Sequence, residues 1–342
     1  MPSPLHAASV LAATLLVCAG PLASAKGLKR PFSFRRTSTF FVFENLPNAT
    51  EIDTATVAEI VAATDDGMML VYTDSQLEAV GFVDISNPSK PRAAGLMEIG
   101  GEPTSVGIKG DYALVAHVNP DSTFVEPNGT LLVIQISTQE VVQSFDLGGQ
   151  PDSVAVSPSG MYAAIAIENE RDEDLGEGRP PQLPAGFLVI MDIEDASPDN
   201  WSMRTVNLTG IADLYPEDPE PEFVNFNTND EVAVTLQENN HVVIVDAASG
   251  DIVSDFSMGS ENLTEIDILE NDLIELTGSQ TNRKREADAI VYIDEDIVAT
   301  ADEGDLDGGS RGFTIFQEDG TVLFAPGSTL EHEVISAGHY PE

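Results

Sequence analysis

The chain is almost without cysteine. Cys18 is the only one, and it lies in an apolar stretch at the N-terminus that we expect to be removed from the mature protein. The mature chain would then have no disulfide, no thiolate nucleophile and no cysteine-ligated metal. An exported fold without disulfides must be held by core burial, and 342 residues are enough to form a sizeable core.

Basic residues are also scarce. The chain has 15 Lys and Arg against 58 Asp and Glu, a net charge of −43. Five of those 15 basic residues lie in residues 26–36, so the remainder is more acidic still. Nucleic acid and anionic membrane surfaces are therefore excluded as favoured partners, because like charges repel. Two interpretations remain open: a solvated acidic surface that keeps the protein soluble, or cation binding.

Long hydrophobic runs are missing too. The longest apolar stretch, residues 7–19, has about thirteen residues, whereas a membrane span needs roughly twenty. Ala23-Ser24-Ala25 follows it and fits the small-x-small rule for signal cleavage. We therefore predict a signal peptide over residues 1–25, an N-terminal segment over 26–54, no transmembrane span, and a secreted or cell-surface location.

Glycosylation is a further expectation that depends on the source. In a eukaryotic secretory pathway the N-x-[ST] sequons would make the protein a glycoprotein. These sequons are at Asn48, Asn128, Asn200, Asn207 and Asn262.

What the sequence does contain is a repeat of short strands. In residues 220–256, apolar runs at 223–226, 231–236, 241–246 and 252–256 are separated by Asn-, Asp- and Gly-rich turns. A four-stranded meander of about thirty-five residues is the size of one β-propeller blade.

Copies of this unit recur along the chain. Similar opening phrases occur at residues 101–106, 149–154, 220–224 and 285–290, and an earlier copy over 58–85 lacks the phrase. We predict an all-β protein, a β-propeller over residues 55–342 with about five four-stranded antiparallel blades. An antiparallel sandwich is the alternative. We expect the sequence to be incomplete, or partner strands to lie elsewhere, because five blades make a small propeller.

Three connecting segments stand out. Residues 168–185 are charged and rich in Pro and Gly, and predict a long loop between the second and third strands of one blade. Residues 266–285 predict a polar connection with room for a short helix. Strand-like residues continue up to Ile335.

The repeat also predicts where a site would lie. In a propeller, the innermost strand starts on the face where the second strand ends, and we call this face the mouth. Two positions per repeat therefore deliver oxygen donors to one rim. The opening phrases contribute Glu102, Asp152, Glu220, Glu222, Glu286 and Asp288. The ends of the second strands contribute Asn119, Glu168, Asn169, Glu170, Gln237, Glu238, Asn239, Asp302 and Glu303.

Calcium is the cofactor that this composition favours. Crowded carboxylates repel unless they are protonated or share a cation, and Ca²⁺ takes six to eight oxygen ligands. The densest patch is residues 302–309, where glycines allow the backbone to bend around an ion; an acidic turn without an ion is the alternative. The predicted metal ligands are Asp302, Glu303, Asp305, Asp307, Glu222, Asp288 and Glu238.

Three phrases resemble one known family. They are similar to sequences of the choice-of-anchor I family. The phrases are EPEFV through AVTLQENNHVVIVDAASGDIV (residues 220–253), READAI through VATADEGDLDGGSRGFTIF (285–316) and EHEVISAGHYPE (331–342). Its members are also described as mesenchyme-specific cell surface glycoprotein-like. The resemblance implies a secreted or surface-attached propeller of the YVTN repeat-like, quinoprotein amine dehydrogenase-like superfamily, continuing beyond residue 342.

The resemblance leaves two functions open. The first is a binding or structural surface protein with an acidic, calcium-binding mouth and an extracellular ligand or surface component as partner. The second is a calcium-dependent phosphoesterase, because some relatives are labelled alkaline phosphatase and the Glu303-Gly304-Asp305 phrase is similar to one in phytase propellers. Few basic residues near the rim could clamp a phosphate; the candidates are Arg285 and Arg311. The first function is therefore favoured, and whether the protein is an enzyme stays open.

Overall fold

Five four-stranded antiparallel sheets follow one another along the chain in the computed structural model. The structure describes residues 35–47, 55–269, 271–306 and 308–339. In each sheet the spatial order of the strands is their order in the sequence. The predicted propeller fold and the predicted count of five blades are both confirmed for this part of the chain.

The strands of the first three sheets match the predicted meanders closely. The first sheet contains β1 (Ala58–Ala63), β2 (Met69–Asp74), β3 (Ala79–Asp84) and β4 (Arg92–Glu98). The second contains β5 (Glu102–Lys109), β6 (Tyr112–Val118), β7 (Gly129–Gln135) and β8 (Glu140–Asp146). The third contains β9 (Gln150–Val156), β10 (Tyr162–Glu168), β11 (Phe187–Asp192) and β12 (Ser202–Val206).

A two-stranded hairpin separates the last two blades. The fourth sheet contains β13 (Pro221–Phe226), β14 (Glu231–Leu236), β15 (His241–Asp246) and β16 (Ile252–Ser257). The hairpin pairs β17 (Ser260–Ile266) with β18 (Gly278–Lys284). The fifth sheet contains β19 (Ala287–Asp294), β20 (Ile297–Asp302), β21 (Gly312–Gln317) and β22 (Val322–Phe324), and helix α1 (Thr329–Ser336) follows it.

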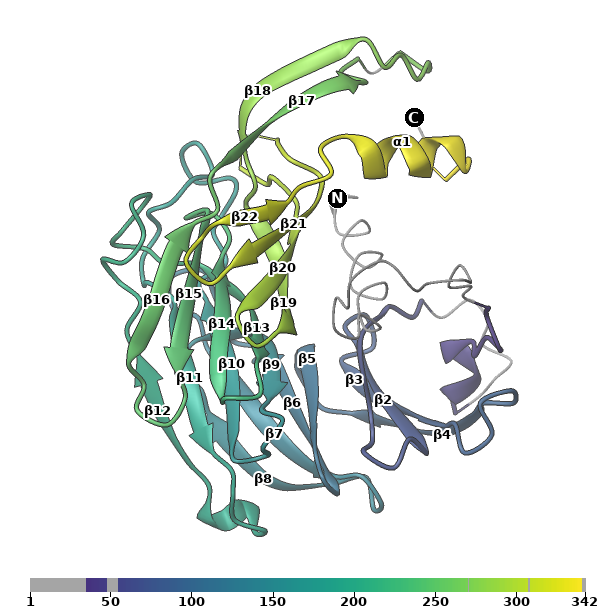
Figure 1. Ribbon diagram of the computed structural model, residues 1–342. Helices are drawn as coiled ribbons and strands as arrows, with labels where there is room; N and C mark the ends of the chain where they lie inside the picture. Colours follow the sequence, from purple (N-terminus) through teal and green to yellow (C-terminus); the bar gives the residue numbers. More distant parts are fainter. Residues whose placement is uncertain (1–34, 48–54, 270, 307, 340–342) are drawn as a thin grey trace.

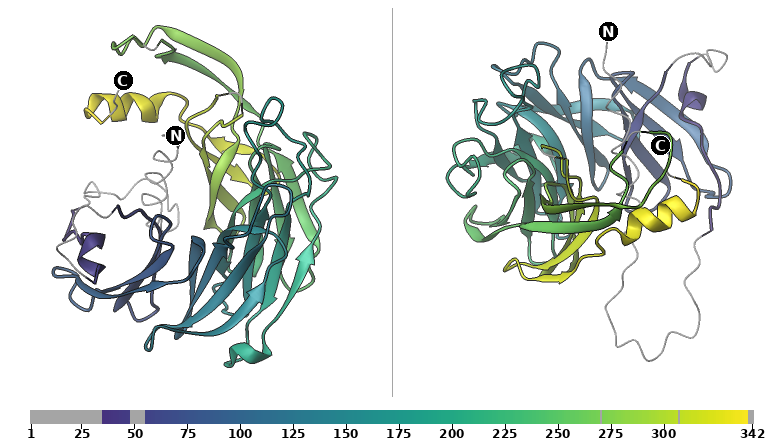
Figure 2. Two further views of the ribbon diagram at one scale, coloured as in Figure 1. Left: turned by 180° about the vertical axis from the view of Figure 1, so that it is seen from behind. Right: turned by 90° about the horizontal axis from the view of Figure 1, so that it is seen from above.

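The sheets stand side by side around an arc, with the first and fifth at its two ends (Figures 1 and 2). The first strand of each sheet is innermost, and β1, β5, β9, β13 and β19 pack against one another in that order. Hydrogen bonds also link these strands: Ser105 Oγ accepts from the Val154 amide at 3.0 Å, and Asn225 Oδ1 accepts from the Tyr292 amide at 2.9 Å. These hydrogen bonds hold neighbouring innermost strands in fixed relative positions.

The core lies between neighbouring sheets rather than within one. Val71 and Phe82 of the first sheet pack with Val115 and Ile134 of the second, and similar clusters fill the next three gaps. The middle strands are covered on both faces. Their sequences are therefore continuous apolar runs, without a strict alternation of apolar and polar residues. Full burial of one such side chain contributes about 1.5–3 kcal/mol.

Two connections differ from the sequence-based expectation. Residues 266–285 were expected to form a polar connection between two blades with room for a short helix; the connection is present, but most of its residues lie in the β17–β18 hairpin or its connecting loop. The stretch up to Ile335 was expected to be strand-like, but Thr329–Ser336 form helix α1. The expected long loop between β10 and β11 is confirmed, and we call residues 169–186 the insertion loop.

Three sequence-based predictions fall outside the described residues: the signal peptide at 1–25, the sequon at Asn48 and the metal ligand Asp307. Within the described residues, no helix has both the length and the apolar character that a membrane crossing requires.

Candidate functional site

Each innermost strand contains a β-bulge near its start. The pairing with the second strand skips one residue just after Ala58, Pro103, Pro151, Pro221 and Ala287. A bulge breaks the regular alternation of the strand and redirects the side chain at that point. The residues that follow these five positions are Glu59, Thr104, Asp152, Glu222 and Asp288, all partly buried. Four of the five blades thus present a carboxylate at the equivalent position of the mouth.

Three carboxylates converge where the third and fourth blades meet. Asp152 lies in β9, Glu168 ends β10 and Glu222 lies in β13. Each offers one carboxylate oxygen, and the three oxygens lie within 4.8 Å of one another. All three side chains are partly buried, and this group is the only such cluster of three among the residues that the structure describes. We call Asp152, Glu168 and Glu222 the mouth cluster.

The mouth cluster is electrostatically unfavourable when it is fully ionised. Burial, followed by the nearby Asp288 carboxylate, raises the pKa of Asp152 to about 8. Burial and neighbouring carboxylates, Asp152 first for Glu168 and Glu168 first for Glu222, raise the pKa of the other two well above the usual range. Near neutral pH the cluster must therefore retain protons or bind a cation.

Two predicted ligands lie around the cluster. Glu238 follows β14 and is buried; one carboxylate oxygen accepts from Arg171, and no donor reaches the other within the described residues. Burial raises the pKa of Glu238 to about 7, and burial with the Glu303 charge raises the pKa of Asp288 to about 6. The sequence placed Glu222, Glu238 and Asp288 at one mouth, and the structure brings them together there.

Asp302, another predicted ligand, has a different environment. Its carboxylate accepts hydrogen bonds from the hydroxyls of Thr300 at 2.7 Å and Thr314 at 2.6 Å. The buried Arg285 guanidinium lies 3.7 Å away and also donates to Thr314 and to the Met258 carbonyl. Both carboxylate oxygens are thus already engaged, which indicates a structural role inside the fifth blade.

We therefore expect Asp302→Asn to destabilise the fold without changing cation binding. The substitution removes the charge that faces Arg285 and weakens one hydrogen bond, and we expect a loss of about 2 kcal/mol in the free energy of unfolding. Urea unfolding measures this loss, and calcium titration of the same variant should give the wild-type affinity. A marked drop in calcium affinity with unchanged stability would return Asp302 to the list of ligands.

The rest of the acidic patch is tied to other parts of the chain. Glu303 accepts from the Gln237 side chain at 2.8 Å, and Asp305 forms an ion pair with Arg171. Gly304 has φ +70°, and a Cβ there would meet the backbone of Gly309 at 2.5 Å, so the turn requires glycine. The structure gives the patch protein partners rather than an inward-facing ring of oxygens, and metal binding by Glu303 or Asp305 stays a prediction.

Arg171 links the insertion loop to two other blades. Its guanidinium pairs with Glu238 of the fourth blade and with Asp305 of the fifth. In the same loop, the Arg179 guanidinium reaches the Leu306 carbonyl at 3.5 Å. The insertion loop of the third blade therefore extends along the mouth to the fifth.

Asp152 and Glu168 were placed at the rim from the sequence but were not among the predicted metal ligands. Asp152 has no acidic neighbour in the sequence, whereas Glu168 opens the acidic run 168–174. The signal that identifies them is position in the repeat: Asp152 occupies the same place after the bulge as Glu222 and Asp288, and Glu168 ends the second strand of its blade.

A serine motif also lies in this region. Gly308-Gly309-Ser310-Arg311-Gly312 matches the G-x-S-x-G pattern, which in hydrolases places its serine on a turn between a strand and a helix. Here the motif leads into strand β21, and the buried Ser310 hydroxyl lies 3.4 Å from a carboxylate oxygen of Glu261. The local structure therefore does not match that of a nucleophile elbow.

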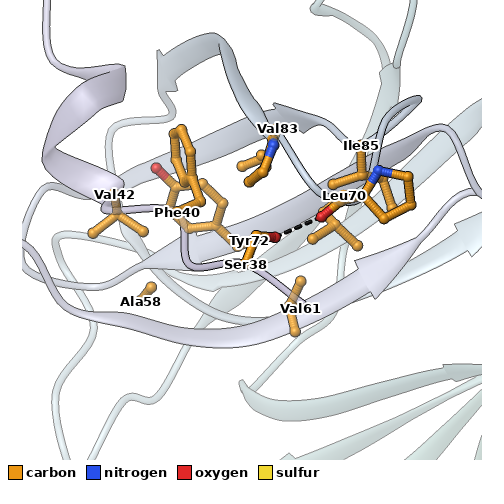
Figure 3. A pocket seen from close by; sticks show the side chains of 11 residues that line it. Ser38, Phe40, Val42, Ala58, Val61, Leu70, Tyr72, Val83 and Ile85 are labelled. Carbon is orange, nitrogen blue, oxygen red and sulfur yellow. Dashed lines mark hydrogen bonds between the residues drawn. The ribbon is translucent and has the colours of Figure 1, made fainter. Parts of the chain in front are cut away.

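A separate cavity lies on the first blade (Figure 3). It has a volume of about 360 Å³ and is lined mainly by apolar side chains, including Phe40, Leu70, Tyr72 and Val83. The Ser38 hydroxyl donates to the Pro88 carbonyl at 2.5 Å across its edge. With so little polar lining, this cavity offers no ligand set for a cation.

The solved structures similar to this chain are varied. A nidogen/laminin complex aligns with a TM-score of 0.49 and 11% identity, covering 79% of this chain and 80% of that one. Hydrazine synthase of Kuenenia stuttgartiensis aligns with a TM-score of 0.46 and 13% identity, covering 76% of this chain and 83% of that one. The Cps50 (Swd1) β-propeller domain of Myceliophteria thermophila aligns with a TM-score of 0.40 and 12% identity, covering 79% of this chain and 87% of that one.

The family assignment comes from sequence. No curated protein matches this chain. The model of the choice-of-anchor I domain matches residues 59–308, which contain four of the five innermost strands, all but the first residue of β1, and all three residues of the mouth cluster. The β-propeller described here thus belongs to the choice-of-anchor I family.

Proposed function

We propose that this chain is the propeller of a secreted or surface-attached protein that binds calcium at its mouth. Asp152, Glu168 and Glu222 would be the protein ligands. The observation that carries this proposal is their geometry: one oxygen from each lies within 4.8 Å of the other two. Carboxylates held this close without a basic partner are typical of a hard-cation site.

The site would leave coordination positions open. Three protein carboxylates supply about three of the six to eight oxygens that calcium takes. Because the cluster is only partly buried, water or an oxygen ligand from another molecule can complete the shell. A carboxylate or phosphate group of an extracellular component fits this requirement, since a bound cation offsets the strong negative charge of the chain.

The calcium-dependent phosphoesterase has less support. Its chemistry needs a basic group that is available to hold the phosphate beside the metal. Arg171 pairs with Glu238 and Asp305, while Arg285 is buried and donates to Thr314 and Met258. Arg171 and Arg285 are thus engaged within the chain, and of the two candidates named from the sequence only Arg311, which is exposed, stays a candidate phosphate clamp.

The surface location rests on the family and on the predicted export signal. The domain name denotes an anchor that varies between members, which supports attachment outside the cell. Detection of the mature N-terminus at Lys26 in secreted material would test the predicted cleavage.

The proposal predicts that Glu222→Gln lowers calcium affinity by on the order of tenfold or more, because it removes one charged ligand from a three-carboxylate set. Isothermal titration of the purified chain, stripped of metal with a chelator, measures the change. Glu140→Gln is the matched control: Glu140 is an exposed carboxylate at the start of the outer strand β8.

Two results would contradict the proposal. Equal affinities for wild type and Glu222→Gln would show that calcium, if bound, lies elsewhere. Calcium-dependent hydrolysis of p-nitrophenyl phosphate that is lost in Glu222→Gln would instead make the mouth cluster a catalytic metal site.

A further inference from the structure

The base of the insertion loop contains a second group of oxygen donors, separate from the mouth cluster. Asn169 begins the loop directly after β10, and Asp218 and Glu220 directly precede β13. The Asn169 amide lies 3.4 Å from Glu220 Oε2, and the Gln182 amide donates to Asp218 Oδ2 at 2.6 Å. The Asn169 side-chain amide donates to the Gln182 carbonyl. These contacts link Asn169, Asp218 and Glu220 to one another, directly or through Gln182.

Each of the three side chains has one oxygen without a donor. Asn169, Asp218 and Glu220 are 1%, 0% and 1% exposed. Their atoms Asn169 Oδ1, Asp218 Oδ1 and Glu220 Oε1 have no hydrogen-bond partner among the described residues. More than nine in ten buried polar groups in proteins are satisfied, so three unsatisfied acceptors on linked residues call for a missing partner.

The surrounding groups do not provide that partner. The Asp218 and Glu220 carboxyl groups lie within hydrogen-bonding reach of each other. A single proton shared between them would satisfy that pair but would leave Asn169 Oδ1 without a donor. The basic side chain nearest in the loop, Arg171, pairs with Glu238 and Asp305 instead. A cation bound among them would supply the missing partner of each oxygen.

We propose that a second calcium ion binds here, coordinated by Asn169 Oδ1, Asp218 Oδ1 and Glu220 Oε1. All three ligands are oxygens, one of them a neutral amide, and all three come from irregular segments next to strands. Such mixed sets of carboxylate and amide oxygens suit calcium, whereas magnesium demands a stricter octahedron. We call these three residues the loop-base site.

The loop-base site would give calcium a structural effect on the insertion loop. It joins the first residue of the loop to the segment that leads into β13, and Gln182 near the end of the loop bonds to two of the three ligands. An ion at this position would therefore close the loop at both ends and keep Arg171 along the mouth.

The test is the number of calcium ions bound and the protease sensitivity of the loop. Wild type should bind two ions per chain, whereas Asp218→Asn and Glu222→Gln should each bind one. Asp218→Asn removes only a buried negative charge and keeps the side-chain shape, so the metal-free variant is expected to fold. Glu220→Gln is a second variant with the same expected loss of one ion.

Proteolysis distinguishes the loop-base site from the mouth cluster. A glutamate-specific protease can cut at Glu173 and Glu177, which are exposed in the insertion loop. Calcium at one hundred times its dissociation constant should slow this cleavage by on the order of 100-fold in wild type. The protection should disappear in Asp218→Asn and persist in Glu222→Gln.

The outcomes separate the two proposals. If Asp218→Asn and Glu220→Gln bind as many ions as wild type and keep calcium protection of the loop, the pair shares a proton and the loop-base site is refuted. If only Glu222→Gln retains the wild-type stoichiometry, the mouth proposal fails while the loop-base site stands.

Discussion

The metal-free protein is expected to lose stability as the pH rises from about 5 to 8, and calcium should remove most of that loss. Burial first, and then neighbouring carboxylates, raise the pKa of Asp152 to about 8 and that of Asp288 to about 6. For Glu238, burial raises the pKa to about 7 despite the opposing charge of Arg171. In the unfolded chain these groups titrate near pH 4.

The sign follows from proton binding. Between about pH 4 and the raised values, the folded protein holds protons that the unfolded chain has released. The unfolded state is therefore favoured as the pH rises through that window. Each unit of pKa difference is about 1.4 kcal/mol, so Asp152 alone accounts for about 4 kcal/mol between pH 5 and its raised pKa, or roughly 6 °C in Tm. Calcium competes with these protons, so its stabilising effect should grow with pH.

Thermal unfolding at pH 5, 6, 7 and 8, with a chelator and with excess calcium, measures this effect. The two Tm profiles should meet at low pH and diverge at high pH. Magnesium at the same concentration is the matched control, with a smaller divergence expected. A Tm in chelator that stays level or rises between pH 5 and 8 would show that these carboxylates are not crowded in solution.

The blade repeat could be found from sequence because each blade has its own local signals. In residues 220–256, the apolar runs and their Asn-Asp and Ser-Gly turns specify β13 to β16 almost residue by residue. Two segments were harder to predict. Residues 260–284 are mostly polar and bury few apolar side chains, Leu263 and Ile266 in β17, yet they pair as the β17–β18 hairpin. Residues 329–336 contain β-branched residues but fold as helix α1, where none of them is buried.

The candidate site was harder to predict because carboxylates that are close in sequence need not have free oxygens close together in space. Residues 302–307 look like the strongest cation site, but Thr300, Thr314 and Arg171 satisfy Asp302 and Asp305. The mouth cluster is dispersed over some seventy residues, and the bulges bring it together. Position in the repeat can predict which residues share a rim, but only packing between sheets sets the distance between their oxygens.

Glu168→Gln is expected to raise the stability of the metal-free protein and abolish most of its stabilisation by calcium. One Glu168 oxygen lies within 4.8 Å of oxygens of Asp152 and Glu222, and burial, followed by the Asp152 charge, raises the pKa of Glu168 well above the usual range. At pH 8 the wild type must either protonate this group or bury its charge, whereas glutamine requires neither. We expect a gain of about 3 kcal/mol, or several degrees in Tm, in the presence of a chelator.

The same substitution should leave little response to calcium, because it removes one of three charged ligands. One substitution would then raise the Tm of the metal-free protein and reduce the increase in Tm that calcium causes. This combination is expected of a site where a bound cation relieves repulsion between carboxylates. A carboxylate with a purely structural role would lose stability in both conditions. Glu140→Gln, on the exposed edge of the second blade, should change neither value. If Glu168→Gln lowers the Tm in chelator, then its carboxylate stabilises the fold directly and the mouth is not built around a cation.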